Sequence, residues 1–267
     1  MNSSNREEIG RGDRFAFGRN WSKYSAKLTE RKIADARQSL SEWLGSADLS
    51  GKKFIDVGSG SGVFSLAARQ LGARVLSFDY DPDSVECTRS LKSKYYPNDA
   101  DWSVQTGSVL NPGFLAHLGS HDVVYSWGVL HHTGDMHEAL ANVVSLVNPG
   151  GHLFIAIYND QAWVSRYWTC VKRLYNRSQI GRFLMIALHC PYLIGGRYLV
   201  RALQGRASSE RGMTLWYDML DWLGGYPFEV AKPEEILEFY RARGFVLEHM
   251  RTCGGRHGCN EFLFRRI

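Results

Sequence analysis

The sequence predicts an α/β fold built on a mostly parallel sheet, and three observations support this. Short apolar runs typical of buried strands alternate with stretches of helical periodicity over residues 53–157. A glycine-rich turn at 58–62 joins the first predicted strand to the first predicted core helix. The last two predicted strands, 245–251 and 260–264, are separated by a turn typical of an antiparallel hairpin. In such folds helices cover both faces of the sheet, and ligands bind at the carboxyl ends of the strands.

The amino-terminal residues and the composition set the context for these elements. Residues 1–14 are polar and we expect them to be loose, whereas residues 15–24 bring aromatic side chains ahead of a helix that reaches about residue 44. Charged residues crowd the start of the chain, which argues against a signal peptide. The five cysteines form no Cys-x-x-Cys pair, which suits a reducing compartment. We therefore expect a cytoplasmic protein.

The core elements follow in a regular order. A strand at 53–57 leads to a helix at 62–71, a strand at 74–79 and a helix from Pro82 to about Tyr95; strands near 102–106 and 122–126, a helix at about 136–146 and a strand at 152–157 come next. The next core helix, 233–243, begins only after a long interval that is too long for an unstructured loop. We expect an inserted, mostly helical segment there, near the ligand-binding end of the sheet. The predicted division of the chain is 1–48, 49–158, 159–230 and 231–267.

The insertion carries most of the positive charge. Between residues 166 and 211 there are nine basic residues and one acid, a net charge of +8. Such a field attracts phosphate, carboxylate, nucleic acid or an anionic membrane surface. An apolar run at 183–194 is too interrupted to span a bilayer, but it could lie on one, form a lid over a lipid-like or aromatic substrate, or form a dimer interface. The plain structural alternative is a helical cap with a solvated basic face.

The glycine-rich turn narrows the class of ligand. Counted from Gly58, the sixth position is Val63, which disfavours a dinucleotide such as NAD. Asp56 precedes the turn, and a carboxylate there would repel a pyrophosphate but attract an ammonium or sulfonium group. Asp79 ends the second strand and is placed to accept hydrogen bonds from two ribose hydroxyls. S-adenosylmethionine (SAM) has both cations and the ribose.

The motifs resemble those of the seven-stranded Rossmann-like, SAM-dependent methyltransferases, closest to small-molecule O-methyltransferases. The resemblance rests on four segments over about residues 49–153: Asp56-Val-Gly-Ser-Gly-Ser-Gly62, Asp79, the strand and Leu-His-His segment at 121–132, and Leu146-Val-Asn-Pro-Gly-Gly151. It implies an antiparallel carboxy-terminal hairpin strand and SAM contacts at Asp56, Gly58, Ser59, Gly60, Gly62, Asp79, Tyr80, Ser108 and Trp127. Ser108 stands where the family often has an acid for the adenine amino group, and a hydroxyl accepts that bond more weakly.

His131 and His132 are the candidate catalytic residues. Transfer from SAM to a hydroxyl requires positioning of the acceptor and removal of its proton, and a neutral histidine is a suitable base. Both residues follow the fourth strand, and one imidazole could instead pack and bond to the backbone. His257 lies between Cys253 and Cys259, but no second pair of ligands accompanies it, so we expect no metal site.

The candidate acceptor-binding residues come from the same end of the fold. They are Trp21, Tyr158, Asn159, Tyr217, Asp218 and Glu229. Trp21 could equally be an aromatic staple, and Tyr158 and Asn159 could form a turn and a helix cap.

The predicted function is methylation of a hydroxyl on a small molecule or glycoconjugate, anionic or lipid-linked. Methylation of a small amine stays open as the nearest variant. One alternative is an RNA or protein methyltransferase that uses the basic insertion, although nucleic acid is less favoured because the Asn/Asp-Pro-Pro-aromatic signature is absent. Another is a non-catalytic SAM-binding or membrane-surface module. No transmembrane segment is predicted, and peripheral membrane contact and a homodimer both stay open.

Overall fold

A seven-stranded sheet forms the centre of the molecule in this computed structural model, which describes residues 2–25, 28–195 and 215–267. The strand order is β3-β2-β1-β4-β5-β7-β6, and only β7 runs antiparallel to its neighbours. The strands are β1 (Lys53–Val57), β2 (Arg74–Asp79), β3 (Trp102–Thr106), β4 (His121–Trp127), β5 (Val147–Tyr158), β6 (Phe245–Arg251) and β7 (Cys259–Arg266). The predicted fold class is confirmed, including the antiparallel carboxy-terminal hairpin.

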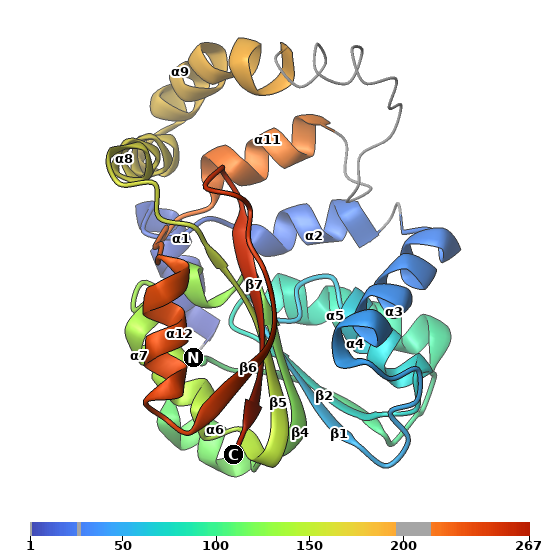
Figure 1. The fold of residues 1–267 in the computed structure, drawn as a ribbon. Coiled ribbons are helices and arrows are strands. Elements are labelled where there is room, and N and C mark those ends of the chain that lie inside the picture. Colours follow the sequence, from blue (N-terminus) through green and yellow to red (C-terminus); the bar gives the residue numbers. More distant parts are fainter. Residues whose placement is uncertain (1, 26–27, 196–214) are drawn as a thin grey trace.

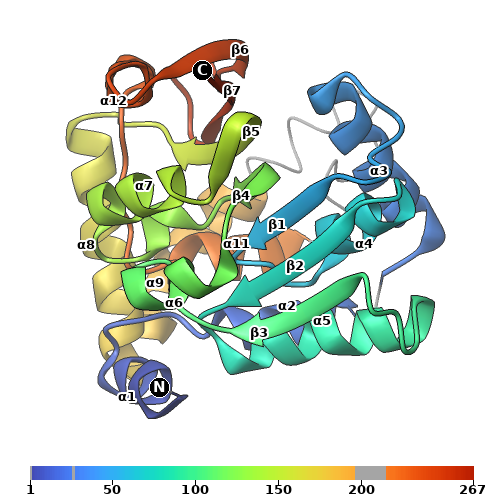
Figure 2. The ribbon, with the colours of Figure 1, turned by 90° about the horizontal axis from the view of Figure 1, so that it is seen from below.

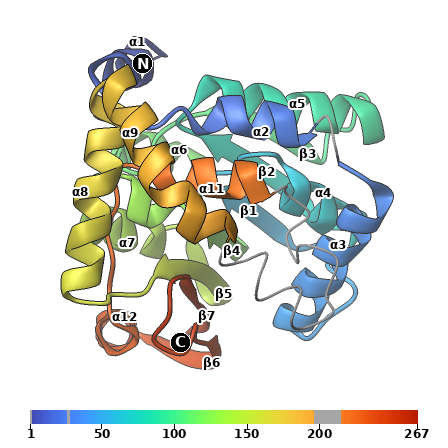
Figure 3. The same ribbon diagram turned by 90° about the horizontal axis from the view of Figure 1, so that it is seen from above.

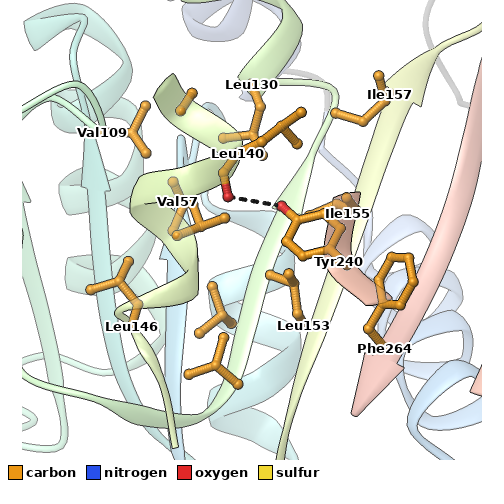
Figure 4. Packing of buried hydrophobic residues seen from close by; sticks show 14 of the residues in the cluster. Val57, Val109, Leu130, Leu140, Leu146, Leu153, Ile155, Ile157, Tyr240 and Phe264 are labelled. Carbon is orange, nitrogen blue, oxygen red and sulfur yellow. Dashed lines mark hydrogen bonds between the residues drawn. The ribbon is translucent and has the colours of Figure 1, made fainter. Parts of the chain in front are cut away.

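Helices cover both faces of this sheet (Figure 2). One face packs against α3 (Glu30–Leu44), α4 (Val63–Gln70) and α5 (Pro82–Tyr95), and the other against α6 (Pro112–Leu118), α7 (Met136–Val144) and α12 (Pro233–Arg241). On the second face, the buried Tyr240 hydroxyl donates to the carbonyl of Leu140 at 3.2 Å, which ties α12 to α7 (Figure 4). The carboxyl ends of the parallel strands are thereby held at one edge of a rigid core.

The amino-terminal residues are more ordered than the sequence predicts. Residues 1–14 were expected to be loose, but Asn2–Arg11 form helix α1. Arg14 explains the difference, because its guanidinium pairs with Glu8 at 2.6 Å and donates to the carbonyls of His132 and Thr133. The Tyr80 hydroxyl also donates to Glu8, at 2.9 Å. Tertiary contacts thus stabilise a helix whose polar sequence gives little sign of one. Helix α6 and the length of β5 were also not predicted.

The insertion after β5 is helical in its described part. It contains α8 (Trp163–Arg177), α9 (Gln179–Cys190), a short π-helical turn η2 (Pro191–Gly195) and α11 (Leu215–Gly224). These helices, together with α2 (Phe17–Ser25), lie at the end where the parallel strands finish (Figures 1 and 3). Within the described ranges, every helix is too short or too polar to cross a lipid bilayer.

Candidate active site

The turn after β1 is covered by an aromatic side chain from α2. Gly60 has φ +54°, and a Cβ there would lie 3.0 Å from the Trp21 indole. Gly58 has φ +82°, and its Cβ would lie 2.4 Å from the Val129 side chain. Both conformations favour glycine, and the close neighbours leave no room for a larger residue. The structure therefore brings Trp21 against the predicted ligand-binding turn.

Asp79 lies beside this turn at the carboxyl end of β2. Its Oδ2 accepts a hydrogen bond from the amide of Gly60 and its Oδ1 accepts one from the amide of Asp81, both at 2.9 Å. Burial raises the pKa of Asp79 to about 6, and the two amide bonds oppose that rise. Each carboxylate oxygen has a second lone pair, so the group can accept two further hydrogen bonds. A vicinal diol such as that of ribose matches this acceptor pair.

Asp56 lies near the carboxyl end of β1, with its side chain buried. It is 3% exposed and accepts a hydrogen bond from the Ser65 hydroxyl at 2.5 Å. That hydroxyl accepts from Ser77, which in turn accepts from the Trp102 indole. Burial raises the pKa of Asp56 to about 7. Asp56 thus belongs to a buried network between β1, β2, β3 and α4, and its predicted attraction of a cationic ligand stays a prediction.

Three other predicted cofactor residues, Ser59, Gly62 and Tyr80, lie at the same edge and contact the protein itself. The hydroxyls of Ser59 and Thr88 are 2.9 Å apart, and a Cβ on Gly62 would lie 3.0 Å from Thr88. Tyr80 follows Asp79 and bonds to Glu8 in α1. These contacts fasten α5 and α1 to the predicted site, and direct contact of the three residues with a ligand stays a prediction.

Ser108 and Trp127 also have partners within the chain. The Ser108 hydroxyl accepts a hydrogen bond from the amide of Leu110 at 3.1 Å, which closes the turn after β3. The Trp127 indole donates to Glu261 at 2.7 Å, across β5. The hydroxyl hydrogen of Ser108 is not used in its bond to Leu110, so this residue can also act as a donor.

The two candidate histidines have opposite proton arrangements. His132 Nδ1 lies 2.6 Å from the carbonyl of Pro227, so Nδ1 carries the hydrogen and Nε2 keeps its lone pair. His131 Nδ1 accepts from the amide of Tyr158 at 3.3 Å, so its hydrogen is on Nε2, a buried atom without a hydrogen-bond partner among the described residues. Burial lowers the pKa of His132 to about 3 and that of His131 well below its usual value. Both rings are therefore neutral near pH 7.

Lys172, which sequence reasoning counted only as surface charge, is buried beside these histidines. It is 0% exposed, donates to the carbonyl of Trp222 and lies 4.4 Å and 4.6 Å from the ring centres of Trp222 and Phe228. Burial lowers its pKa to about 7, and the Asp221 carboxylate opposes that change. Helical spacing could have revealed its position, because Trp168 and Tyr175 precede and follow it on the buried face of α8.

Tyr158 joins the histidines to the insertion. Its ring centre lies 4.0 Å from that of His131 and 5.4 Å from that of His132. It also lies 5.6 Å from Trp222 and 5.2 Å from Phe228. The predicted acceptor residue Tyr158 is thus brought together with both predicted catalytic residues in an aromatic cluster.

Asn159 and Glu229, also predicted to bind the acceptor, adjoin this cluster, but their side chains bond to other parts of the chain. Asn159 accepts a hydrogen bond from the Asn260 side chain at 3.0 Å, which joins the ends of β5 and β7. The Glu229 carboxylate accepts from the amides of Gly134 and Met136 and so caps α7. Contact of either side chain with an acceptor stays a prediction. Tyr217 and Asp218 belong to α11, but their side chains lie outside the described part of the structure.

Comparison with known proteins gives one family and several distant relatives. A family model described as a methyltransferase domain matches residues 25–206, more than half of the chain. A ubiquinone biosynthesis O-methyltransferase from Cupriavidus pinatubonensis is 32% identical over 120 residues, 44% of this chain and 46% of that protein. A ribosomal protein L11 methyltransferase from Photobacterium profundum is 33% identical over 125 residues, 43% of this chain and 36% of that protein. The chain thus spans less than half the length of these relatives.

A solved structure resembles the chain over nearly its whole length. The magnesium protoporphyrin IX methyltransferase from Synechocystis PCC 6803, with bound SAH, has a TM-score of 0.57 and 14% identity, covering 98% of this chain and 100% of that one. At this identity the likeness concerns the fold alone. The two relatives with similar identity differ in acceptor, so the matched segment does not determine what is methylated.

Proposed function

The chain belongs to the methyltransferase-domain family and is a SAM-dependent methyltransferase, and from this premise we propose that it methylates a hydroxyl group of a small molecule or glycoconjugate. The observation that carries the proposal is the orientation of His132. Its Nδ1 hydrogen is held by the carbonyl of Pro227, so Nε2 is left as the acceptor of a proton. An O-methyltransferase is among the relatives that the chain matches over part of its length.

The residues at the strand ends fit SAM. The carboxylate of Asp79 has the acceptor capacity for the ribose diol, and a Cβ on Gly60 would fill the space against the Trp21 ring. We infer that the turn at 58–62 holds the amino-acid part of SAM and that Ser108 lies near its adenine ring. When bound, SAM supplies a methyl group already activated by its sulfonium.

His132 acts on the acceptor hydroxyl in this proposal. As the acceptor oxygen bonds to the methyl carbon, the carbon–sulfur bond breaks and the hydroxyl becomes strongly acidic, so even a weak base takes its proton. The low pKa of His132 keeps Nε2 unprotonated and ready for this role. His131 positions the site through its bond to the Tyr158 amide, and Tyr158, Trp222 and Phe228 favour an acceptor with an apolar or aromatic part.

Titration calorimetry with S-adenosylhomocysteine tests the donor site. Asp79→Asn removes the negative charge and replaces one acceptor oxygen by an NH2 group, which can only donate. We therefore expect the affinity for S-adenosylhomocysteine to fall by roughly a hundredfold or more. Asp83→Asn, two residues beyond the Asp81 cap of α5, is the control and should bind as the wild type does. Equal affinity in Asp79→Asn and the wild type would contradict the assignment.

The acceptor is sought with methyl-labelled SAM and fractionated small-molecule extracts. We expect labelled product that survives alkali, as a methyl ether does, and a large loss of turnover in His132→Gln. His137→Gln, an exposed histidine in α7, should retain full activity. Labelling of an amine or of protein instead, or full activity in His132→Gln, would refute the hydroxyl and base assignments separately from the donor site.

The alternative of protein methylation has one specific support, the L11 methyltransferase relative. The described part of the insertion lends it less support than the sequence suggested, because Lys172 is buried and does not contribute to an exposed basic surface. Arg197, Arg201, Arg206 and Arg211, which carry much of the predicted charge, lie outside the described residues.

A further inference from the structure

Helix α9 exposes an apolar face. Ile180, Phe183, Leu184, Ala187 and Leu188 recur at the spacing of one helical side, and all are exposed. The exposed fractions of the first three are 75%, 72% and 53%, and that of Leu188 is 66%. A water-facing helix side normally carries charged or polar residues, so this composition is inverted.

The opposite side of α9 already has its packing partners. Met185, Ile186 and Leu193 of η2 join the cluster of buried residues formed with α8 and α11. His189 is 4% exposed and packs on Trp168. Its Nδ1 donates to the carbonyl of Met185, so its Nε2 accepts a hydrogen bond from the Tyr167 hydroxyl at 2.7 Å. The orientation of α9 is therefore set by the interior of the insertion, and its apolar face is directed outward by that packing.

Helix α8 adds positive charge and interfacial aromatic residues beside this face. Its exposed residues recur at helical spacing and are Trp163, Arg166, Tyr167, Cys170, Arg173, Leu174 and Arg177. Trp163 is 70% exposed and Tyr167 45%. No aspartate or glutamate occurs between Asp160 and Glu210, so nothing in this stretch of sequence neutralises the arginines. We call the exposed residues of α8 and α9 together the α8–α9 face.

We propose that the α8–α9 face binds the surface of an anionic phospholipid bilayer. Apolar side chains enter the boundary between head groups and acyl chains, tryptophan and tyrosine lie at the head groups, and arginines pair with lipid phosphates. A second copy of the chain fits less well, because a two-fold contact would bring two sets of arginines together without acids. A nucleic acid would match the arginines but leave the Phe183 side of α9 in water.

The placement of the face has a consequence for the orientation of the bound protein. The insertion lies at the end of the sheet where the parallel strands finish, and α9 crosses above α11 (Figure 3). A bilayer on the α8–α9 face would thus lie on the same end of the molecule as Asp79 and His132. This proposal stands on exposed residues alone and does not depend on the acceptor or the base.

Vesicle flotation at low salt tests the proposal. The full chain is mixed with phosphatidylcholine vesicles that contain or lack phosphatidylglycerol. We expect the wild type to float with the anionic vesicles. Phe183→Gln combined with Leu188→Gln should lower the partition coefficient by at least about tenfold, since two apolar side chains that would enter the bilayer are replaced by polar ones. Arg166→Gln combined with Arg177→Gln should lower the partition coefficient by roughly fivefold for each charge removed. Added salt should also lower the partition coefficient of the wild type.

Val246→Gln on β6 is the matched control, because it removes a 41% exposed apolar side chain far from α9. It should float as the wild type does. Wild-type protein that does not bind anionic vesicles, or binding that the α9 substitutions leave unchanged, would overturn the proposal. So would a dimer in solution that the Phe183→Gln and Leu188→Gln pair dissociates while flotation is absent, since the face would then belong to a second copy.

Discussion

Replacing Lys172 by methionine tests the electrostatics of the insertion most directly. Lys172 is 0% exposed, and burial lowers the pKa of its ammonium from 10.5 to about 7. Methionine keeps a long flexible side chain but cannot bind a proton. The substitution should therefore remove one pH-dependent contribution to the free energy of unfolding and leave the others in place.

The sign and size follow from the two pKa values of Lys172. Its folded pKa is below its unfolded pKa, so between pH 7 and 10.5 the unfolded chain binds more protons and the wild type gains stability as pH rises. A difference of 3.5 units corresponds to about 5 kcal/mol in full, at about 1.4 kcal/mol per unit. The bond to the Trp222 carbonyl and the ring contacts favour the charged form of Lys172 and so reduce this contribution. We therefore expect the free energy of unfolding of the wild type to rise by about 2 kcal/mol relative to that of Lys172→Met between roughly pH 7.5 and 9.5.

Urea unfolding at several pH values measures this difference. The free energy of unfolding of the wild type, minus that of Lys172→Met, should rise with pH across this range. Lys52→Met, which replaces an exposed lysine, should follow the wild type in parallel. Parallel curves for the wild type and Lys172→Met would refute the reasoning, because they would show that the buried amine keeps its proton in the folded state.

Three further predictions concern the glycine-rich turn at 58–62, the core and the proposed catalytic base. Gly60→Ala should weaken S-adenosylhomocysteine binding and cost about 1–3 kcal/mol, because its Cβ meets the Trp21 ring at φ +54°; Gly51→Ala, at φ +76° in open space, gives the backbone cost alone in the same thermal and calorimetric assays. Tyr240→Phe should cost about 1–2 kcal/mol in urea unfolding, because a buried carbonyl of α7 loses its donor. With SAM at saturation, so that the Asp79 carboxylate is already engaged, kcat/KM for the acceptor should show no fall centred near pH 6.5, since burial lowers the pKa of His132 to about 3; such a fall would contradict this.

The sequence was sufficient for the sheet and for the position of the donor turn. Strand and helix periodicities alternate regularly there, and parallel strands must end at one edge, which brings Gly58 and Asp79 together wherever the rest of the chain lies. The helical insertion followed from the length of chain between β5 and α12. These inferences depend on local pattern and on general rules of topology.

The roles of individual polar side chains were less predictable, because they depend on contacts between distant segments. Glu229 caps α7, more than ninety residues earlier in the chain, and the sequence shows only an acid near aromatic residues. The side chain of Asp56 lies on the face of β1 that α4 covers, where the Ser65 hydroxyl donates to it. Lys172 reads as surface charge until the partner helices of α8 are known.

The segment at residues 14–25, whose Trp21 covers the glycine-rich turn, is held in part by residues much later in the chain. The amide of Phe15 donates to the carbonyl of Tyr226, and Asn20 bonds to Asp221, a separation of about two hundred residues. Arg14 similarly needs the carbonyl of His132. During synthesis this early segment emerges first, and its contacts with α5, such as the bond from the Gly18 amide to the Asp81 carboxylate, can form before its contacts with the insertion. A nascent chain that has not yet reached α11 therefore lacks part of what holds Trp21 over the glycine-rich turn.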